Sequence, residues 1–142
     1  MAKQGPVILF EEDELEIQVI IQAFKKLQLP NKIHAFNNGD ELLNYLYTTK
    51  EAPFIIISDI GDHVINGLEL RRKINADEYL RKKSIPFVFL TDVKSKKAVA
   101  EAFEMSVQGY FLKQNTIADL EIHLRRIIDY WMACYHPNNT FD

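Results

Sequence analysis

Acidic residues follow two short, largely apolar stretches of the chain. The cluster Glu11-Glu12-Asp13 directly follows residues 7–10, and Asp59 directly follows residues 54–58. From the cluster we expect Glu12 and Asp13 to converge with Asp59. Carboxylates that crowd together destabilise one another unless a cation or a proton lies between them. Hard, oxygen-binding ions such as Mg²⁺ meet that need. If the two stretches are neighbouring strands, the sequence therefore predicts a divalent cation site where they end.

The elements that would hold these groups alternate along the chain. Continuous apolar stretches are typical of strands buried on both sides of a parallel sheet, and apolar residues at helical spacing follow each of them. Alternating strands and helices with short connections favour right-handed crossovers, which bring the C-terminal ends of all strands to one edge of the sheet. We expect five strands at residues 7–10, 32–36, 54–58, 86–90 and 110–112, each followed by a helix.

Composition indicates one globular domain. The chain has 142 residues, 47% hydrophobic and 26% charged, so we expect a single domain over residues 1–142, with its core at 7–131 and a short polar tail at 136–142. The formal net charge is −3 and no apolar stretch reaches membrane-spanning length. We interpret the basic cluster at residues 71–73 as solvated surface. The single Cys134 cannot form an internal disulfide, and we expect a cytoplasmic protein that binds neither nucleic acid nor membrane.

Polar residues also follow the other expected strands. Thr91 ends the fourth strand, and Lys113 directly follows the fifth, with Tyr110 three residues before it. Together with the acidic residues described above, this ordered set resembles the receiver domain of two-component response regulators over residues 7–131. The resemblance implies a flavodoxin-like, doubly wound α/β fold with five parallel strands in the order 2-1-3-4-5 and five helices.

The resemblance also implies a role for each residue. Asp59 would accept a phosphoryl group from a sensor histidine kinase, and Thr91 and Lys113 would contact the phosphoryl oxygens. Thr91 and Tyr110 would form a switch that changes the surface after phosphorylation. The groups that would hold Mg²⁺ are Glu12, Asp13, Asp59 and the backbone carbonyl of Gly61.

Within that family, the chain resembles stand-alone receivers that serve bacterial phytochromes and other sensor kinases. This narrower resemblance rests on residues 29–31, on residues 42–46, on the long segment 77–84 before the fourth strand, and on Tyr130 and Trp131. Such a receiver is expected to pass on its signal by protein contact or by phosphorelay. The aromatic end formed by Tyr130, Trp131 and Tyr135 suggests contact with a second copy, as in a homodimer, or with a partner; completion of the core explains it equally well.

Departures from the family pattern leave two other functions open. The usual receiver residues are replaced at Glu12, at the Asp-His pair 62–63, at Asp92 and at Gln114. One alternative is therefore a pseudo-receiver that binds its partners without phosphorylation. The other is a Mg²⁺-dependent phosphatase with a strand-end aspartate, a class that needs a second acid two residues later, where Gly61 stands.

Overall fold

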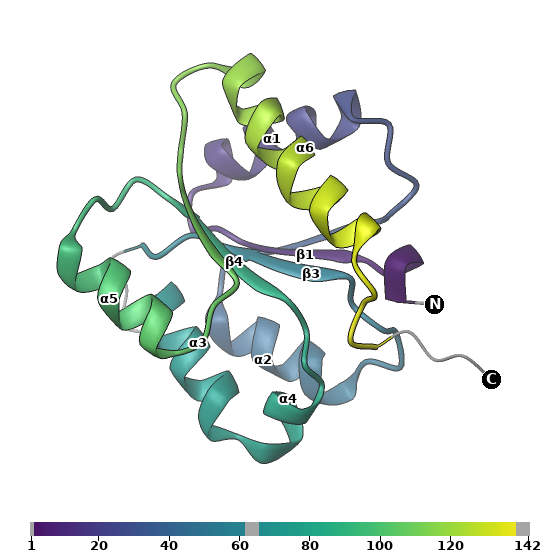
Figure 1. Ribbon diagram of the computed structural model, residues 1–142, viewed down its shortest axis with the longest axis vertical. Coiled ribbons are helices and arrows are strands. Elements are labelled where there is room, and N and C mark those ends of the chain that lie inside the picture. The colour runs from purple at the N-terminus through teal and green to yellow at the C-terminus, as the bar shows by residue number, and fades with distance from the viewer. Residues whose placement is uncertain (1, 62–65, 139–142) are drawn as a thin grey trace.

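The computed structural model describes residues 2–61 and 66–138 and is built around a five-stranded parallel sheet (Figure 1). The strand order is β2-β1-β3-β4-β5, as the resemblance implied. The strands are β1 (Val7–Phe10), β2 (Ile33–Phe36), β3 (Ile55–Ser58), β4 (Phe87–Thr91) and β5 (Gly109–Leu112). All five strands predicted from the sequence are confirmed.

Helices cover both faces of the sheet (Figure 1). One face carries α1 (Glu14–Lys26) and α6 (Ile117–Ala133). The other face carries α2 (Gly39–Thr48), α3 (Gly67–Ala76), α4 (Glu78–Lys82) and α5 (Lys96–Glu104). A 3-10 turn, Ala2–Gln4, precedes β1. The short α4 adds to the five predicted helices, because Asp77 caps a single further turn before β4 by accepting the Leu80 N–H at 3.0 Å.

The central strands are buried on both faces. Leu9 and Ile57 pack toward α1 and α6, whereas Ile8 and Phe89 pack toward the helices of the opposite face. This two-sided burial explains why the strands read as uninterrupted apolar stretches, and it leaves polar residues only where the strands end.

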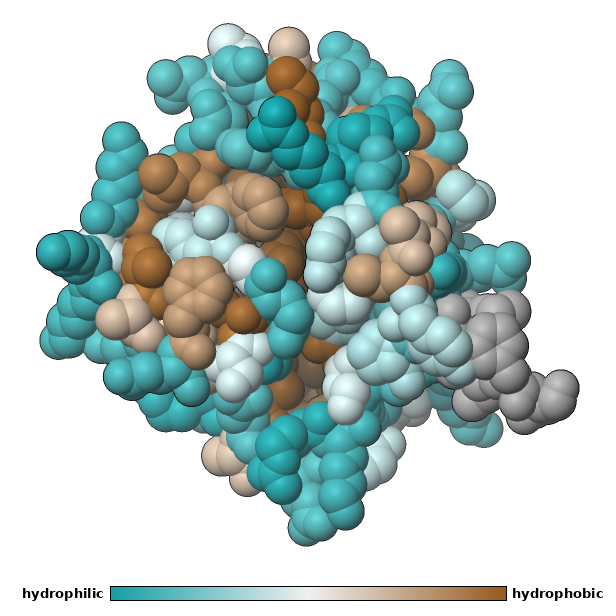
Figure 2. All heavy atoms as spheres, in the orientation of Figure 1, coloured by the Kyte–Doolittle hydropathy of each residue, from teal (hydrophilic) through white to brown (hydrophobic). Residues whose placement is uncertain are grey.

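No helix in the two described ranges is both long and apolar enough to cross a membrane. Figure 2 shows hydrophobic side chains gathered over the β5 edge, between α5 and α6.

The chain after α6 folds back onto the domain. His136 is fully buried, its Nε2 lies 2.7 Å from the Phe54 carbonyl oxygen, and its Nδ1 accepts the Asn138 N–H at 3.0 Å. We therefore assign the ring proton to Nε2. Residues 136–138 therefore do not form the polar tail that the sequence predicted, because the buried His136 ring anchors them to the domain. Residues 139–142 lie outside the described part of the chain.

Arg71 also differs from the expectation of a solvated basic cluster. It is only 8% exposed, and its Nε and Nη2 donate to the carbonyl oxygens of Met105 and Ser106 at 3.0 and 3.1 Å. Its guanidinium lies 5.1 Å from the centre of the Phe87 ring. The prediction for residues 71–73 was thus wrong at Arg71, because the end of α5 offers two carbonyl acceptors that draw the side chain inward.

Candidate functional site

The acidic residues meet because β1 and β3 end side by side. Phe10 pairs with Ser58 in the sheet, so the next residues, Glu11 and Asp59, leave the same edge together. The Asp59 N–H donates to the Phe10 carbonyl at 2.9 Å. The side chains of Glu11 and Asp59 are only 3% and 13% exposed. Two shielded carboxylates at one edge need a positive charge nearby.

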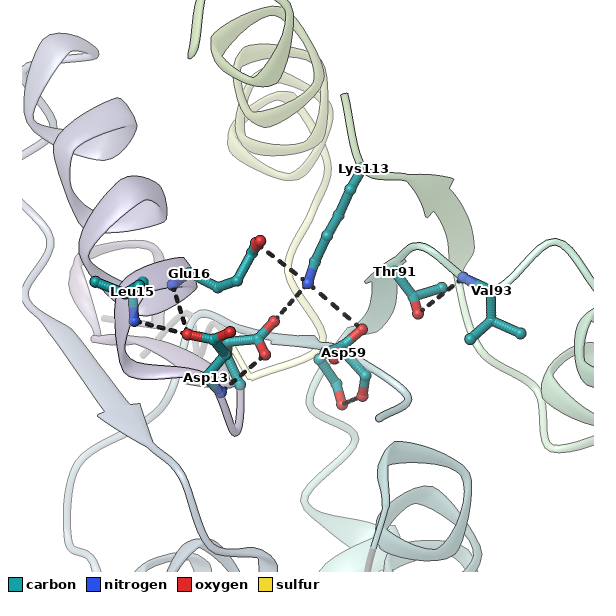
Figure 3. A network of polar contacts seen from close by, with 9 residues as sticks. Asp13, Leu15, Glu16, Asp59, Thr91, Val93 and Lys113 are labelled. Atoms are coloured by element: carbon teal, nitrogen blue, oxygen red, sulfur yellow. Dashed lines mark hydrogen bonds and ion pairs between the residues drawn. The ribbon is translucent and has the colours of Figure 1, made fainter. Parts of the chain in front are cut away.

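Lys113, directly after β5, supplies that charge (Figure 3). Its Nζ lies 2.7 Å from Glu11 Oε2, 3.3 Å from Glu16 Oε2 and 3.7 Å from Asp59 Oδ1. The lysine side chain is itself only 9% exposed. One buried cation is therefore shared by three carboxylates, and its shortest contact is with Glu11.

The protonation of this cluster follows from burial and charge. Burial raises the pKa of the Glu11 carboxyl; the hydrogen bond from Lys113 opposes that rise and the charge of Asp59 adds to it. Burial acts to lower the pKa of Lys113, but the hydrogen bond to Glu11 and the surrounding carboxylates outweigh it and raise that pKa. Glu11 Oε1 also accepts the Asp13 N–H at 3.2 Å. Since both Glu11 oxygens accept hydrogen bonds, we interpret the Glu11–Lys113 pair as ionised at neutral pH.

Glu12 and Gly61 lie against each other beside this cluster. A Cβ built on Gly61 would lie 2.5 Å from Glu12 Oε1, so the carboxylate occupies space that any other side chain would need. Gly61 has a φ of 69°, in the left-handed region that glycine adopts without a steric penalty. The loop that follows Asp59 thus leaves space for the Glu12 carboxylate, because Gly61 has no side chain.

Asp13 is positioned differently from Glu12. It is exposed, and its Oδ1 accepts the N–H groups of Leu15 and Glu16 at 2.8 and 3.4 Å (Figure 3). It is the N-cap of α1, a role that typically stabilises a helix by about 1 kcal/mol. The buried residue that sequence reasoning missed is Glu11. Its position directly after the last strand residue, matching that of Asp59, was the available signal.

Thr91 and Tyr110 are linked through one residue. Thr91 is fully buried at the end of β4, and its Oγ1 accepts the Val93 N–H at 3.3 Å. The Tyr110 hydroxyl donates to the Val93 carbonyl at 2.6 Å. Burial raises the pKa of that hydroxyl, and the charge of Asp59 adds to the rise. A movement of the Thr91 hydroxyl can therefore reach Tyr110 through the backbone of Val93.

A polar pocket of about 370 Å³ opens next to Lys113. Two of the residues that depart from the receiver pattern, Asp92 and Gln114, contribute to its lining. Asp92 is exposed, so its charge faces any molecule that approaches by this route. The Asp-His pair at 62–63 lies outside the described residues.

The donor atoms at this edge suit an oxygen-binding cation. Carboxylates from Glu11, Glu12 and Asp59, with the carbonyl of Gly61 in the adjoining loop, are the ligand types that Mg²⁺ prefers. Within the described ranges, no three acidic, histidine or cysteine side chains are gathered around one point. Lys113 instead bridges two of the carboxylates. The types of ligand atom and the space beside Gly61 fit the ion. To bind it, Lys113 and the carboxylates must rearrange, because Lys113 now lies between Glu11 and Asp59.

Comparison with known proteins identifies the class. The sequence matches the model of the response regulator receiver domain over residues 7–125. The chain therefore belongs to the response regulator receiver family of two-component signalling.

Individual relatives come from different signalling contexts. A probable methanogenesis regulatory protein, FilR2 of Methanothrix harundinacea, is 26% identical over 131 residues, which cover 89% of this chain and 83% of FilR2. The chemotaxis protein CheY-3 of Vibrio cholerae is 31% identical over 98 residues, which cover 66% of this chain and 74% of CheY-3.

Solved structures with the same fold include phytochrome-associated response regulators. The phosphorylated cyanobacterial phytochrome response regulator RcpA has a TM-score of 0.82 at 21% identity, covering 95% of this chain and 99% of its own. The bacteriophytochrome response regulator AtBRR has a TM-score of 0.70 at 21% identity, covering 95% and 97%. The Mn²⁺-bound form of Rcp1 has a TM-score of 0.74 at 19% identity, covering 96% and 99%. At these identities the likeness establishes the fold.

Proposed function

We propose that this protein accepts a phosphoryl group on Asp59 from a sensor histidine kinase. The observation that carries the proposal is the buried lysine shared between Glu11 and Asp59 at the C-terminal edge of the sheet. Phosphoryl transfer depends mainly on positioning and on neutralising charge. A carboxylate nucleophile beside a buried positive charge supplies both.

The transfer itself is a displacement at phosphorus. An oxygen of Asp59 bonds to the phosphorus atom as the N–P bond of a phosphohistidine breaks, and the departing imidazole takes up a proton from solvent. Lys113 Nζ lies 3.7 Å from Asp59 Oδ1, and a short side-chain movement away from Glu11 would bring it to the new phosphoryl oxygens. The polar pocket beside Lys113 gives the donor a route to the site.

The same edge would hold Mg²⁺. We assign its protein ligands to Glu11, Glu12, Asp59 and the Gly61 carbonyl, directly or through water, and keep Asp13 as the helix cap that it forms here. When bound, the ion neutralises the negative charge that builds up between the carboxylate and the incoming phosphoryl group. Glu11 then has a second role, since it releases Lys113 when its own charge is met by the ion.

The readout would pass through Thr91 and Tyr110. After transfer, the Thr91 hydroxyl would turn to donate to a phosphoryl oxygen and would leave the Val93 N–H that it now accepts. Val93 also holds the Tyr110 hydroxyl at 2.6 Å, so its displacement would free the tyrosine ring. The Tyr110 ring would then have two positions, one for each phosphorylation state. The surface that α5 and β5 present to a partner would differ between them.

The proposed partners are proteins. The phytochrome-associated response regulators among the structural neighbours support a sensor kinase of the phytochrome type as the phosphodonor. The exposed Tyr130 and Tyr135, at 63% and 66%, support a contact with a second copy or a downstream protein, whereas Trp131 packs against the core. Phosphorelay or direct contact would then carry the signal onward.

The first alternative, a pseudo-receiver, draws support from the shared lysine itself. Lys113 already has Glu11 and Glu16 as partners, so its positive charge is balanced without a phosphoryl group. The phosphatase alternative has weaker support, because Gly61 provides no acid and the family consists of signalling domains. The pseudo-receiver reading is therefore the one that the experiment must separate from phosphoacceptance.

The experiment is labelling with acetyl phosphate, with and without Mg²⁺, followed by the mass of the intact protein. We expect one phosphoryl adduct that requires Mg²⁺ and is lost in Asp59→Asn. Asp13→Asn is the matched control, because it removes an exposed carboxylate that caps α1, and it should still be labelled. Absence of an adduct with acetyl phosphate and with a phosphorylated histidine kinase would favour the pseudo-receiver.

A further inference from the structure

A second cavity lies at the edge of the sheet opposite the acidic cluster. It has a volume of about 430 Å³ and is lined by residues that precede β4 and β5, such as Pro86 and Gln108, by α3 and α4, and by Trp131 of α6. Ligand sites in proteins commonly have volumes of roughly 300 to 1,000 Å³. The cavity is therefore large enough for a molecule of about one ring with a substituent.

All charged side chains that line the cavity are positive. Arg71 and Arg81 both contribute to the lining, and no carboxylate does. In the part of the chain that the structure describes, neither arginine forms an ion pair. The remaining polar groups, which include Asn75 and Ser106, are neutral. Arg81 donates to the Asn75 carbonyl at 3.0 Å, and its charge also acts on Asp77, which lies outside the lining. The lining itself thus presents two positive charges and no negative one.

Arg71 gives the strongest indication that this cavity binds a ligand. It is more than nine-tenths buried, and its partners are the neutral carbonyls of Met105 and Ser106 and the uncharged ring of Phe87. Burial lowers the pKa of its guanidinium to about 10, which reflects the free-energy cost of keeping this charge away from water. Buried charges in proteins are usually paired with an opposite charge. An anion in the cavity would supply that missing partner.

The apolar part of the lining defines the rest of the ligand. Ile74, Leu80 and Ile85 line the same space as the arginines, and the indole of Trp131 adds a flat surface. Water or a bare inorganic ion would leave these walls without contacts. A compact apolar or aromatic body attached to the anionic group satisfies both parts of the lining.

The geometry points to a binding site for a small organic anion, with its carboxylate or phosphate group on Arg71 and Arg81 and its body against Trp131. The site lies beyond the proposed function, since it includes no residue of the acidic cluster. Carboxylates and phosphates both form charge-assisted hydrogen bonds with guanidinium groups. The two ligand types are separated by the experiment.

The single tryptophan of the chain provides the readout. We would titrate the protein with benzoate, with phenylphosphonate, which cannot donate a phosphoryl group, and with benzyl alcohol as a neutral molecule of similar size. A saturable change in Trp131 fluorescence is expected with at least one anion and not with the alcohol. The anion that binds more tightly tells whether the site prefers a carboxylate or a phosphate. Equal binding of the alcohol, or no saturable change with either anion, would overturn the inference.

Variants locate the binding. Arg81→Gln changes an exposed side chain and should weaken binding by about tenfold or more; unchanged affinity in this variant contradicts the assignment. Arg72→Gln is the matched control, because Arg72 is exposed on α3, next to Arg71 in the sequence, and does not line the cavity. Asp59→Asn should also bind normally, so that failure of this inference and failure of phosphoacceptance are told apart.

Discussion

Replacing Lys113 with methionine tests how the acidic cluster is held together. Methionine keeps most of the apolar length of the side chain and removes only its charge and hydrogen bonds. The change eliminates the 2.7 Å contact to Glu11 and the longer contacts to Glu16 and Asp59. It leaves Glu11 buried, with its side chain only 3% exposed, and without a counter-charge.

The size of the effect follows from these contacts. Two unit charges 2.7 Å apart attract each other by about 6 kcal/mol at an effective dielectric constant of about 20. The cost of removing both charges from water offsets much of that attraction, and breaking a buried pair on one side typically costs about 3 to 5 kcal/mol. We expect Lys113→Met to lose that amount of unfolding free energy. Adding Glu11→Gln should restore part of it, because no carboxylate is then left buried.

The assay is urea unfolding without divalent ions, followed by Trp131 fluorescence and by circular dichroism. The coupling free energy between Glu11 and Lys113 in the double-mutant cycle should be at least about 1.5 kcal/mol. Lys26→Met is the control, because Lys26 pairs with Glu121 at 3.4 Å while its own side chain is 62% exposed. That change should cost less than about 1 kcal/mol. Additive effects in the cycle, or a Lys113→Met protein as stable as wild type, would refute the proposed compensation.

Three further changes test other parts of the account. Gly61→Ala should cost about 1 to 2 kcal/mol of unfolding free energy, since a left-handed residue gains a Cβ that meets Glu12 Oε1. Tyr110→Phe removes a hydrogen bond of 2.6 Å and should cost about 1 kcal/mol in the same urea assay; unchanged stability would argue against the bond. Burial lowers the pKa of His136 below 6.5, so the unfolded chain binds its proton more readily. Stability should therefore fall as the pH drops below 6.5 through the folded-state pKa. His136→Gln should lack that fall in thermal unfolding, even though both side chains can donate to the Phe54 carbonyl.

The sheet could be predicted because its strands are set by a simple physical condition. A strand buried on both faces has no polar position, so residues such as Ile55 and Phe87 mark its extent without reference to the rest of the chain. Polar residues that follow such strands must gather at one edge. Asp59, Thr91 and Lys113 do lie there.

The inward-facing member of the acidic run was missed in the sequence, although Glu11 follows β1 as directly as Asp59 follows β3. Three acidic residues follow one another, and which side chain turns toward Asp59 depends on where β1 ends and on the register of Phe10 with Ser58. A shift of one residue reverses the direction of every side chain in a strand. The strand ends at Phe10 and α1 begins at Glu14, so Asp13 is taken up as the helix cap and Glu11 reaches Lys113.

Arg71 and His136 were misjudged because their partners are distant in the sequence. Arg71 is drawn inward by a carbonyl 34 residues away, and His136 by one 82 residues away. Backbone acceptors of this kind carry no side-chain signature. A basic or polar residue can therefore become part of the core through a contact that only the folded chain reveals.

Trapping the acyl phosphate would identify the residue that accepts the phosphoryl group. Borohydride reduces an aspartyl phosphate to homoserine, so peptide mass spectrometry after phosphorylation and reduction identifies the residue that carried the phosphoryl group. We expect homoserine at position 59 and unmodified carboxylates at Glu11, Glu12 and Asp13. Modification at one of those three residues, or at none of the four, would contradict that expectation.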